Sequence, residues 1–345
     1  METVWFVLVV FMLTMYVVLD AFDLGVGAIH LFVAKTDAER RLVLQAIGPV
    51  WDGNEVWLVA AAGTLFFTFP RLYGASFSGF YLPLMIVLWL LILRGLAVEL
   101  RSRGNAVWSS LWDGLFGLAS MLLPLFLGAG IANVVRGVPL DSQGYFFEPL
   151  WTDLNPRSLN PGILDWYTVL IGGLAFAGLV MHGAHFLALK TEGEVQARAR
   201  RIASRAWLGT VLLTALGTAA TFFVRPDLLA NFAARPWGDA LPVVAVGGLL
   251  LVRRFNATGR DGSSLIGSGV FLAGMLASSA FALYPDVLPA TVAVNSLTVN
   301  NAAAPQYGLA VGLVWWTLGM TLAAIYSVVV YRLFWGKVHL ADESY

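Results

Sequence analysis

The sequence predicts an all-α integral membrane protein that crosses the bilayer about nine times. Of the 345 residues, 59% are hydrophobic and 12% are charged, whereas about 25% of the residues in a soluble domain are charged. The stretch 262–331 contains a single charged side chain, Asp286. Apolar residues fill whole segments without the alternation that a membrane β-barrel requires. These observations together favour a bundle of membrane-spanning helices.

The composition also excludes several classes of protein. The 21 Lys and Arg residues balance the 21 Asp and Glu residues, which is not the composition of a basic nucleic-acid-binding protein. The apolar content excludes a disordered chain. The chain contains no cysteine, so disulfides, zinc–thiolate sites, iron–sulfur clusters and a cysteine nucleophile are excluded.

Hydropathy places the predicted helices along the chain. A window of about 19 residues finds segments at 4–33, 55–72, 77–99, 111–135, 164–189, 206–224, 239–252, 264–284 and 309–333. No basic region or small-residue cleavage site accompanies the first segment, so we expect a retained span. Residues 1–345 are expected to form a single polytopic membrane domain, arranged as two four-helix bundles plus one extra helix.

The basic residues predict the orientation of these spans. Sixteen of the 21 Lys and Arg residues fall on the face that carries the C-terminus, and five fall on the opposite face. Basic residues favour the cytoplasmic side of a membrane. The sequence therefore predicts an N-terminus outside and a C-terminus in the cytoplasm.

Ionisable residues within or beside the predicted spans are candidates for function, because a charge inside the bilayer is costly. Asp20 and Asp23 are three residues apart in the first span and share one helical face. By the predicted topology, further candidates from three other spans lie on the same cytoplasmic side. They are Asp52, Glu55, Arg94, Glu99 and Asp113.

A structural interpretation of these residues remains open. Asp52 or Asn54 could cap the second span, and Glu55 could face the helix dipole. Arg94 could neutralise Asp20 or Asp23 in an ion pair that serves only the fold.

His182 and His185 near the inner end of the fifth span are candidate cofactor ligands. Two histidines three residues apart on one helix cannot supply both axial ligands of a single haem. The alternative is that both are buried histidines with local hydrogen bonds. No metal site is expected in this chain.

Several motifs resemble those of a known family, the second subunit of cytochrome bd-type ubiquinol oxidases. Residues 20–27 read DAFDLGVG and resemble the family stretch D-x-F-D-x-G-V-G. Residues 48–57 read GPVWDGNEVW and resemble G-P-x-W-D-G-N-x-V-W. Residues 77–81, 94–101, 182–184 and 190–193 also fit the family pattern. The resemblance runs along nearly the whole chain, although the last third is matched more by hydropathy than by motif.

The resemblance implies a multi-pass subunit of a respiratory complex in the cytoplasmic membrane of a bacterium or archaeon. Such a complex oxidises quinol and reduces dioxygen to water. Haem b and haem d are expected in the partner, subunit I, so this chain alone is not expected to be catalytic. Small accessory subunits, membrane lipid, a bound quinone and an oxygen route in this chain are further implied possibilities. A nucleic-acid partner is not expected.

We hypothesise that this chain supports subunit I and carries cytoplasmic protons towards it, which builds a proton-motive force without pumping. Asp20, Asp23 and Asp52 would relay the protons. Further side chains would set their charge state, namely Glu55, Arg94, Glu99 and Asp113. Others would shape the inner mouth of the path, namely Trp51, Gly53, Asn54 and Trp57. The alternatives are a proton-coupled secondary transporter and a purely structural scaffold subunit.

Overall fold

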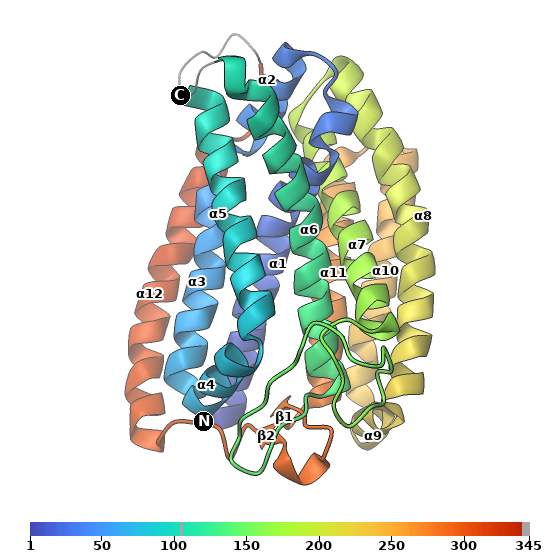
Figure 1. Cartoon of the computed structure of the whole chain (residues 1–345). Helices are drawn as coiled ribbons and strands as arrows, with labels where there is room; N and C mark the ends of the chain where they lie inside the picture. The colour runs from blue at the N-terminus through green and yellow to red at the C-terminus, as the bar shows by residue number, and fades with distance from the viewer. Residues whose placement is uncertain (104–105, 340–345) are drawn as a thin grey trace.

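The computed structural model describes residues 1–103 and 106–339 as a bundle of long, nearly parallel helices (Figure 1). The helices are α1 (Glu2–Val33), α2 (Asp37–Ile47), α3 (Trp51–Thr68), α4 (Pro70–Gly79), α5 (Tyr81–Arg103), α6 (Ser109–Arg136), α7 (Trp166–Lys190), α8 (Gly193–Val224), α9 (Leu229–Ala234), α10 (Ala240–Ala257), α11 (Asp261–Leu283) and α12 (Gln306–Leu333). Two short strands, β1 (Asp286–Leu288) and β2 (Leu297–Thr298), pair in antiparallel fashion.

The long helices form two groups of four with α12 outside them, as the sequence predicts. In the first group α1 packs against α3 and α6, and α6 packs against α5. In the second group α7 packs against α8 and α11, while α10 packs against α11 and α8. Contacts of α1 with α7 and α11, and of α6 with α7, join the groups. Helix α1 is therefore the central helix of the molecule.

Eight of the described helices are long and apolar enough to cross a membrane, and the bent pair α3–α4 makes a ninth span. The bend between α3 and α4 is 120° and falls where Pro70 opens α4. The second predicted span, 55–72, is therefore shifted to 51–68. The third, predicted at 77–99, begins at Tyr81 because α4 occupies the preceding residues.

Two helical segments extend beyond the spans that hydropathy finds. Helix α2 is amphipathic, and Thr36 and Glu39 form a capping box at its start. Helix α8 begins at Gly193, so the charged stretch that precedes the predicted span 206–224 forms the first turns of the helix. The first turns of α8 contain Glu, Gln and Arg residues. These side chains favour a helix but are too polar to be buried in lipid. A hydropathy window therefore locates where α8 becomes apolar and misses where the helix begins.

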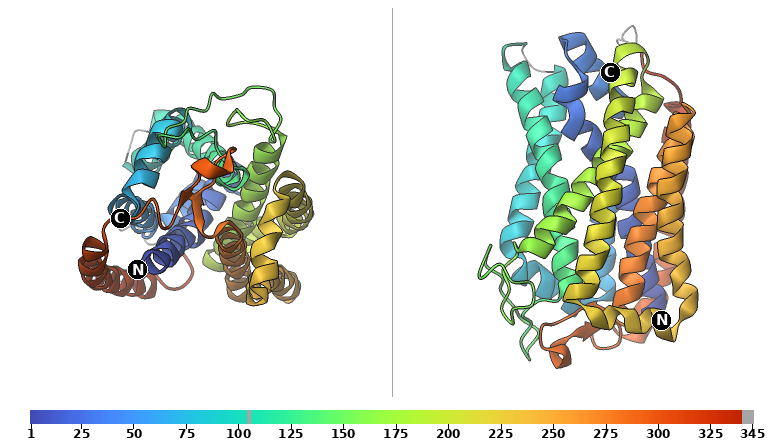
Figure 2. Two further views of the ribbon diagram at one scale, coloured as in Figure 1. Left: turned by 90° about the horizontal axis from the view of Figure 1, so that it is seen from below. Right: turned by 90° about the vertical axis from the view of Figure 1, so that its right-hand side faces the viewer.

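The N-terminus and the last described residues, 334–339, lie at opposite ends of the bundle (Figure 1). We call the end formed by α2 and residues 334–339 the α2 end. At the other end, the hairpin of β1 and β2 lies beside the loop 137–165 (Figures 1 and 2). The backbone of Val138 pairs there with Ala290. We call this the β end; it contains the N-terminus.

Candidate functional site

Arg94 of α5 joins three helices in the interior of the first group. Its guanidinium is fully buried and donates to both oxygens of Asp20 on α1, over 2.9 Å from Nη2 and 3.2 Å from Nη1. Nη1 also donates to Oε1 of Glu55 on α3, over 2.8 Å. The side chain of Glu55 is 25% exposed, whereas that of Asp20 is 1% exposed. Glu55 is thus the member of this group that reaches the surface.

Asp23 lies three residues beyond Asp20 on α1 and is held by an amide instead of a cation. Asn54 of α3 donates from Nδ2 to Oδ2 of Asp23, over 2.7 Å. The Tyr331 hydroxyl of α12 donates to Oδ1 of Asn54, over 2.9 Å. These bonds extend the polar group from the first four-helix bundle to α12. The inner cluster, as we call it below, consists of Asp20, Asp23, Asn54, Glu55 and Arg94.

The inner cluster has more carboxyl groups than cations. Arg94 is the single cation of the cluster and bonds to Asp20 and Glu55, whereas Asp23 is bonded by Asn54. Ionisation of all three carboxyls would therefore leave a net negative charge in a largely buried site. Such a charge is costly unless one of the groups holds a proton. Several polar atoms that could exchange protons or bind water are buried without a partner. They are Oδ1 of Asp23, Nε of Arg94 and the hydroxyl of Tyr16.

Asp113 of α6 belongs to a separate cluster nearer the α2 end, in which both of its carboxylate oxygens are bonded. Its carboxylate accepts hydrogen bonds from Nε of Arg101, over 2.9 Å, and from Nη1 of Arg40, over 3.1 Å. Nε2 of His30 lies 3.0 Å from the same carboxylate. Arg101 also bonds to Asp37 of α2. This cluster ties α1, α2, α5 and α6 together.

The remaining predicted site residues lie around these two clusters. Asp52 is exposed in the first turn of α3, three residues before Glu55 and on the same face. Glu99 is also exposed and pairs with Arg103 over 3.2 Å. The residues predicted to shape the inner mouth differ in exposure. Trp57 is buried and Trp51 is half-buried against Gly95, whereas Gly53 lies against Tyr326 of α12.

A third charged cluster, which the sequence analysis did not identify, is buried at the β end. Arg136, at the end of α6, donates to Glu148 over 2.8 Å and to Asp165 over 2.5 Å. Asp165 also caps α7 by accepting from the backbone N–H groups of Tyr167 and Thr168. Oε2 of Glu148 has no partner. Burial raises the pKa of Glu148 from 4.5 to about 7, although the neighbouring Arg136 lowers it.

Comparison with known proteins identifies the family of this chain. The sequence model of the family described as "Cytochrome bd terminal oxidase subunit II" matches residues 1–334. The chain belongs to the cytochrome bd terminal oxidase subunit II family. The resemblance seen in the motifs is thereby confirmed.

Members of the subunit II family align with the chain over most of its length. "Cytochrome bd ubiquinol oxidase subunit 2" of Bacillus subtilis is 32% identical over 316 residues, which are 90% of this chain and 89% of that protein. "Cytochrome bd-I ubiquinol oxidase subunit 2" of Escherichia coli K12 is 28% identical over 368 residues, which cover 98% and 95%. A chain of the bd oxidase from Geobacillus thermodenitrificans has the same fold, with a TM-score of 0.76 and 18% identity over 96% of this chain and 98% of that one.

Membership of the bd oxidase subunit II family makes the chain one part of an oxidoreductase complex whose other part is a subunit I. The family implies haems in that complex. In the part of the chain that the structure describes, no group of three or more His, Asp or Glu side chains could hold a metal ion. His182 engages both ring nitrogens, with Ser268 over 2.7 Å and with the Val18 carbonyl over 3.0 Å. His185 is buried with both nitrogens unpartnered, but it lies on the same helix. The histidine pair therefore does not fit a bis-histidine haem site.

Within this bd oxidase subunit, sequence reasoning missed residues that complete the clusters. Tyr16 lies four residues before Asp20 and therefore on the same face of α1, a spacing that could have revealed it. Arg101 was used for the topology and as the end of the family motif 94–101 but not as a site residue, and Tyr331 was treated as part of an apolar span. No local pattern in the sequence pairs Tyr331 with Asn54, because they lie 277 positions apart.

Proposed function

We propose that this chain carries protons from the α2 end towards subunit I of a quinol:oxygen oxidoreductase. The single observation that carries the proposal is the inner cluster, in which three carboxyl groups share one cation: Arg94 bonds to Asp20 and Glu55, and Asp23 is bonded only by the Asn54 amide. Reduction of dioxygen to water consumes protons. If those protons come from the cytoplasm while quinol releases its own outside, a proton-motive force forms without a pump.

The distribution of basic residues supports a cytoplasmic position for the α2 end. Most of the Lys and Arg residues belong to α2, the C-terminal segment and the helix ends at this side, and such residues favour the cytoplasmic face of a membrane. The inner cluster is reached from this side, because α3 begins there and carries Glu55 in its second turn.

The contacts suggest an order of steps along the path. Asp52 is exposed and would take a proton from water, and Glu55 would receive it at the edge of the protein interior. Arg94 would hold the carboxyl of Asp20 in place through its two hydrogen bonds. Asp23, which has no cation in contact and one oxygen without a partner, would then accept the proton.

The other predicted residues would act on the path without carrying protons. Asp113 is bonded on both oxygens by two guanidinium groups and lies beside His30, so neither oxygen is open to a proton donor on the path. Glu99 lies on the surface beside Arg103. We propose that both set the charge at the α2 end.

The test replaces Asp23 with Asn in the intact complex and measures oxygen uptake on added quinol. Asn keeps the size of the side chain and cannot carry a proton, so turnover should fall by about tenfold to a hundredfold. The haem absorbance should be unchanged. Glu194→Gln is the matched control, because Glu194 is an exposed acid at the same end, and its turnover should stay normal.

Two outcomes would contradict the relay. Normal turnover in Asp23→Asn would show that Asp23 does not carry the limiting proton. Loss of the haem absorbance together with turnover would instead indicate that Asp23 is needed for assembly of the complex.

A further inference from the structure

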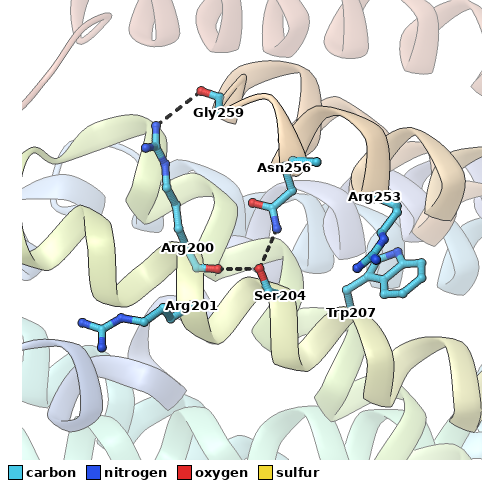
Figure 3. Close-up of a pocket in the computed structure, with 8 residues that line it drawn as sticks. Arg200, Arg201, Ser204, Trp207, Arg253, Asn256 and Gly259 are labelled. Atoms are coloured by element: carbon cyan, nitrogen blue, oxygen red, sulfur yellow. Dashed lines mark hydrogen bonds between the residues drawn. The ribbon is translucent and has the colours of Figure 1, made fainter.

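A basic groove lies between α8 and α10 at the α2 end, away from the inner cluster (Figures 1 and 3). Its volume is about 510 Å³. The groove is formed by the first turns of α8 and the last turns of α10. The residues that matter for its chemistry are Arg200, Arg201, Ser204, Trp207, Arg253 and Asn256.

Two of the three arginines in the groove have no acidic partner. Arg200 is neutralised by Asp261, to which it donates from Nη2 over 2.6 Å and from Nε over 2.9 Å. Arg201 donates from Nε to the Ala197 carbonyl, over 3.4 Å. Arg253 lies over the ring of Trp207, 5.1 Å from its centroid. Among the described residues, neither Arg201 nor Arg253 forms a salt bridge, so the groove carries excess positive charge.

The polar side chains of the groove are held in place by bonds within the wall. Asn256 donates from Nδ2 to Oγ of Ser204, over 2.7 Å, and Ser204 donates to the Arg200 carbonyl, over 3.0 Å (Figure 3). Trp207 donates from its ring nitrogen to the Leu249 carbonyl on α10, over 2.8 Å. The ring is therefore fixed across the two helices, and it supports the guanidinium of Arg253.

Below the groove, both helices present apolar side chains on the same faces as the arginines. On α10, Leu250, Val246 and Val243 precede Arg253 at helical spacing and are exposed. On α8, Leu208 and Leu212 follow Ser204 at spacings of four residues and are exposed as well. A ligand that fits this surface has an anionic head and apolar chains.

We propose that the groove binds the phosphodiester headgroup of an anionic phospholipid, with Arg201 and Arg253 at opposite edges of the groove supplying the positive charge that attracts it (Figure 3). Guanidinium groups bind phosphate through paired N–H donors. Basic pockets between membrane helices are suited to anionic lipid headgroups. A fixed tryptophan at the same level fits the boundary between headgroups and acyl chains. The apolar surfaces of α8 and α10 favour a lipid over a soluble phosphate, because only a lipid would cover them.

Native mass spectrometry of the purified, delipidated complex tests the proposal by titration with phosphatidylglycerol. The double variant Arg201→Gln/Arg253→Gln should bind this lipid about tenfold more weakly. The matched control is Arg205→Gln/Arg254→Gln, which removes two exposed arginines from the same helices outside the groove and should bind as the unaltered complex does. Phosphatidylcholine should bind more weakly than phosphatidylglycerol to the unaltered complex.

Three results would overturn the proposal. An equal loss in the control variant would show that the lipid responds to surface charge in general. Unchanged binding of phosphatidylglycerol by Arg201→Gln/Arg253→Gln would show that neither arginine contributes to the site. Displacement of phosphatidylglycerol by millimolar inorganic phosphate would identify a site for soluble anions. The variants change exposed side chains, and an unaltered melting temperature of the complex verifies that they fold.

Discussion

Asp20 and Asp23 lie three residues apart on one helix and have different surroundings. Asp20 is bonded on both oxygens by one guanidinium, so protonating it would break a charge-assisted pair. Asp23 has only an amide donor on one oxygen and no partner on the other. A proton can therefore join Asp23 without the loss of an ion pair. This difference is the reason that Asp23, and not Asp20, is the informative position for substitution.

The β-end cluster leads to a prediction about pH and stability. Because burial raises the pKa of Glu148 from 4.5 to about 7, the folded protein holds a proton between these pH values that the unfolded chain has released. Folding is then favoured at the lower pH, and this contribution is lost as pH rises through 7. We expect the apparent melting temperature of the complex to fall less steeply from pH 5 to pH 8 in Glu148→Gln than in the unaltered protein.

A control for Glu148 lies in the same loop. Asp153 is exposed, and a backbone hydrogen bond from Asn155 keeps its pKa below the ordinary value. Asp153→Asn should leave the pH dependence unchanged between pH 5 and pH 8. If the melting temperature changed with pH equally in Glu148→Gln and in the unaltered protein, the raised pKa of Glu148 would be contradicted.

At the scale of elements, glycines allow the backbones of α1 and α7 to lie in direct contact in the core. A Cβ added to Gly183 would lie 2.4 Å from the backbone of Gly25 and Val26. This close contact places Gly183 of α7 directly against the turn of α1 that follows Asp23. Small residues permit such contacts between membrane helices.

We predict that Gly183→Ala destabilises the subunit by roughly 1–3 kcal/mol, because neither backbone can move without disturbing its own packing. Turnover should also fall, since α1 carries Asp20 and Asp23. Gly173→Ala is the control on the same helix, because its Cβ would meet no atom within 4 Å. Thermal unfolding of the two variants measures the difference. Equal stability would show that α1 and α7 can separate at little cost.

At the scale of the whole molecule, hydropathy was sufficient to locate the spans but did not show how they begin and bend. The predicted second and third spans were displaced because α4 turns by 120° after Phe69, and hydropathy carries no directional information. Helix α2 was not predicted, although its Thr36–Glu39 capping box is visible in the sequence.

The candidate site was predictable as a list of residues but not as a set of pairs. Asp20, Asp23 and Arg94 could be predicted because charged residues are rare within membrane spans. The structure brings these three residues together with Glu55. The same reasoning grouped Asp113 with them, whereas the structure places it in a cluster with Arg101. Which charged side chains form pairs depends on which sides of the helices pack against each other. That information comes from tertiary packing, so spacing along a single helix cannot supply it.

Helix α12 presents the surface that we expect subunit I to cover. Leu309 is its one buried residue among those described, and Trp315 is 71% exposed. An aromatic groove of about 530 Å³ runs between α3 and α12. The Cβ positions of Gly308 and Gly319 are open, which would let another helix approach closely. Tyr331 also joins α12 to the inner cluster, so a proton path towards a partner would leave through this side.

A photoreactive amino acid placed at Trp315 should therefore cross-link to subunit I in the intact complex, detected as a shift in mass on a denaturing gel. The same substitution at Leu212 of α8 is the control. Leu212 is exposed and apolar too, but it lies on the side that we assign to lipid. Cross-linking to subunit I from Leu212 and not from Trp315 would reverse the assignment of the two faces. It would also separate the inner cluster from the partner that it is proposed to supply, because Tyr331 would then face lipid.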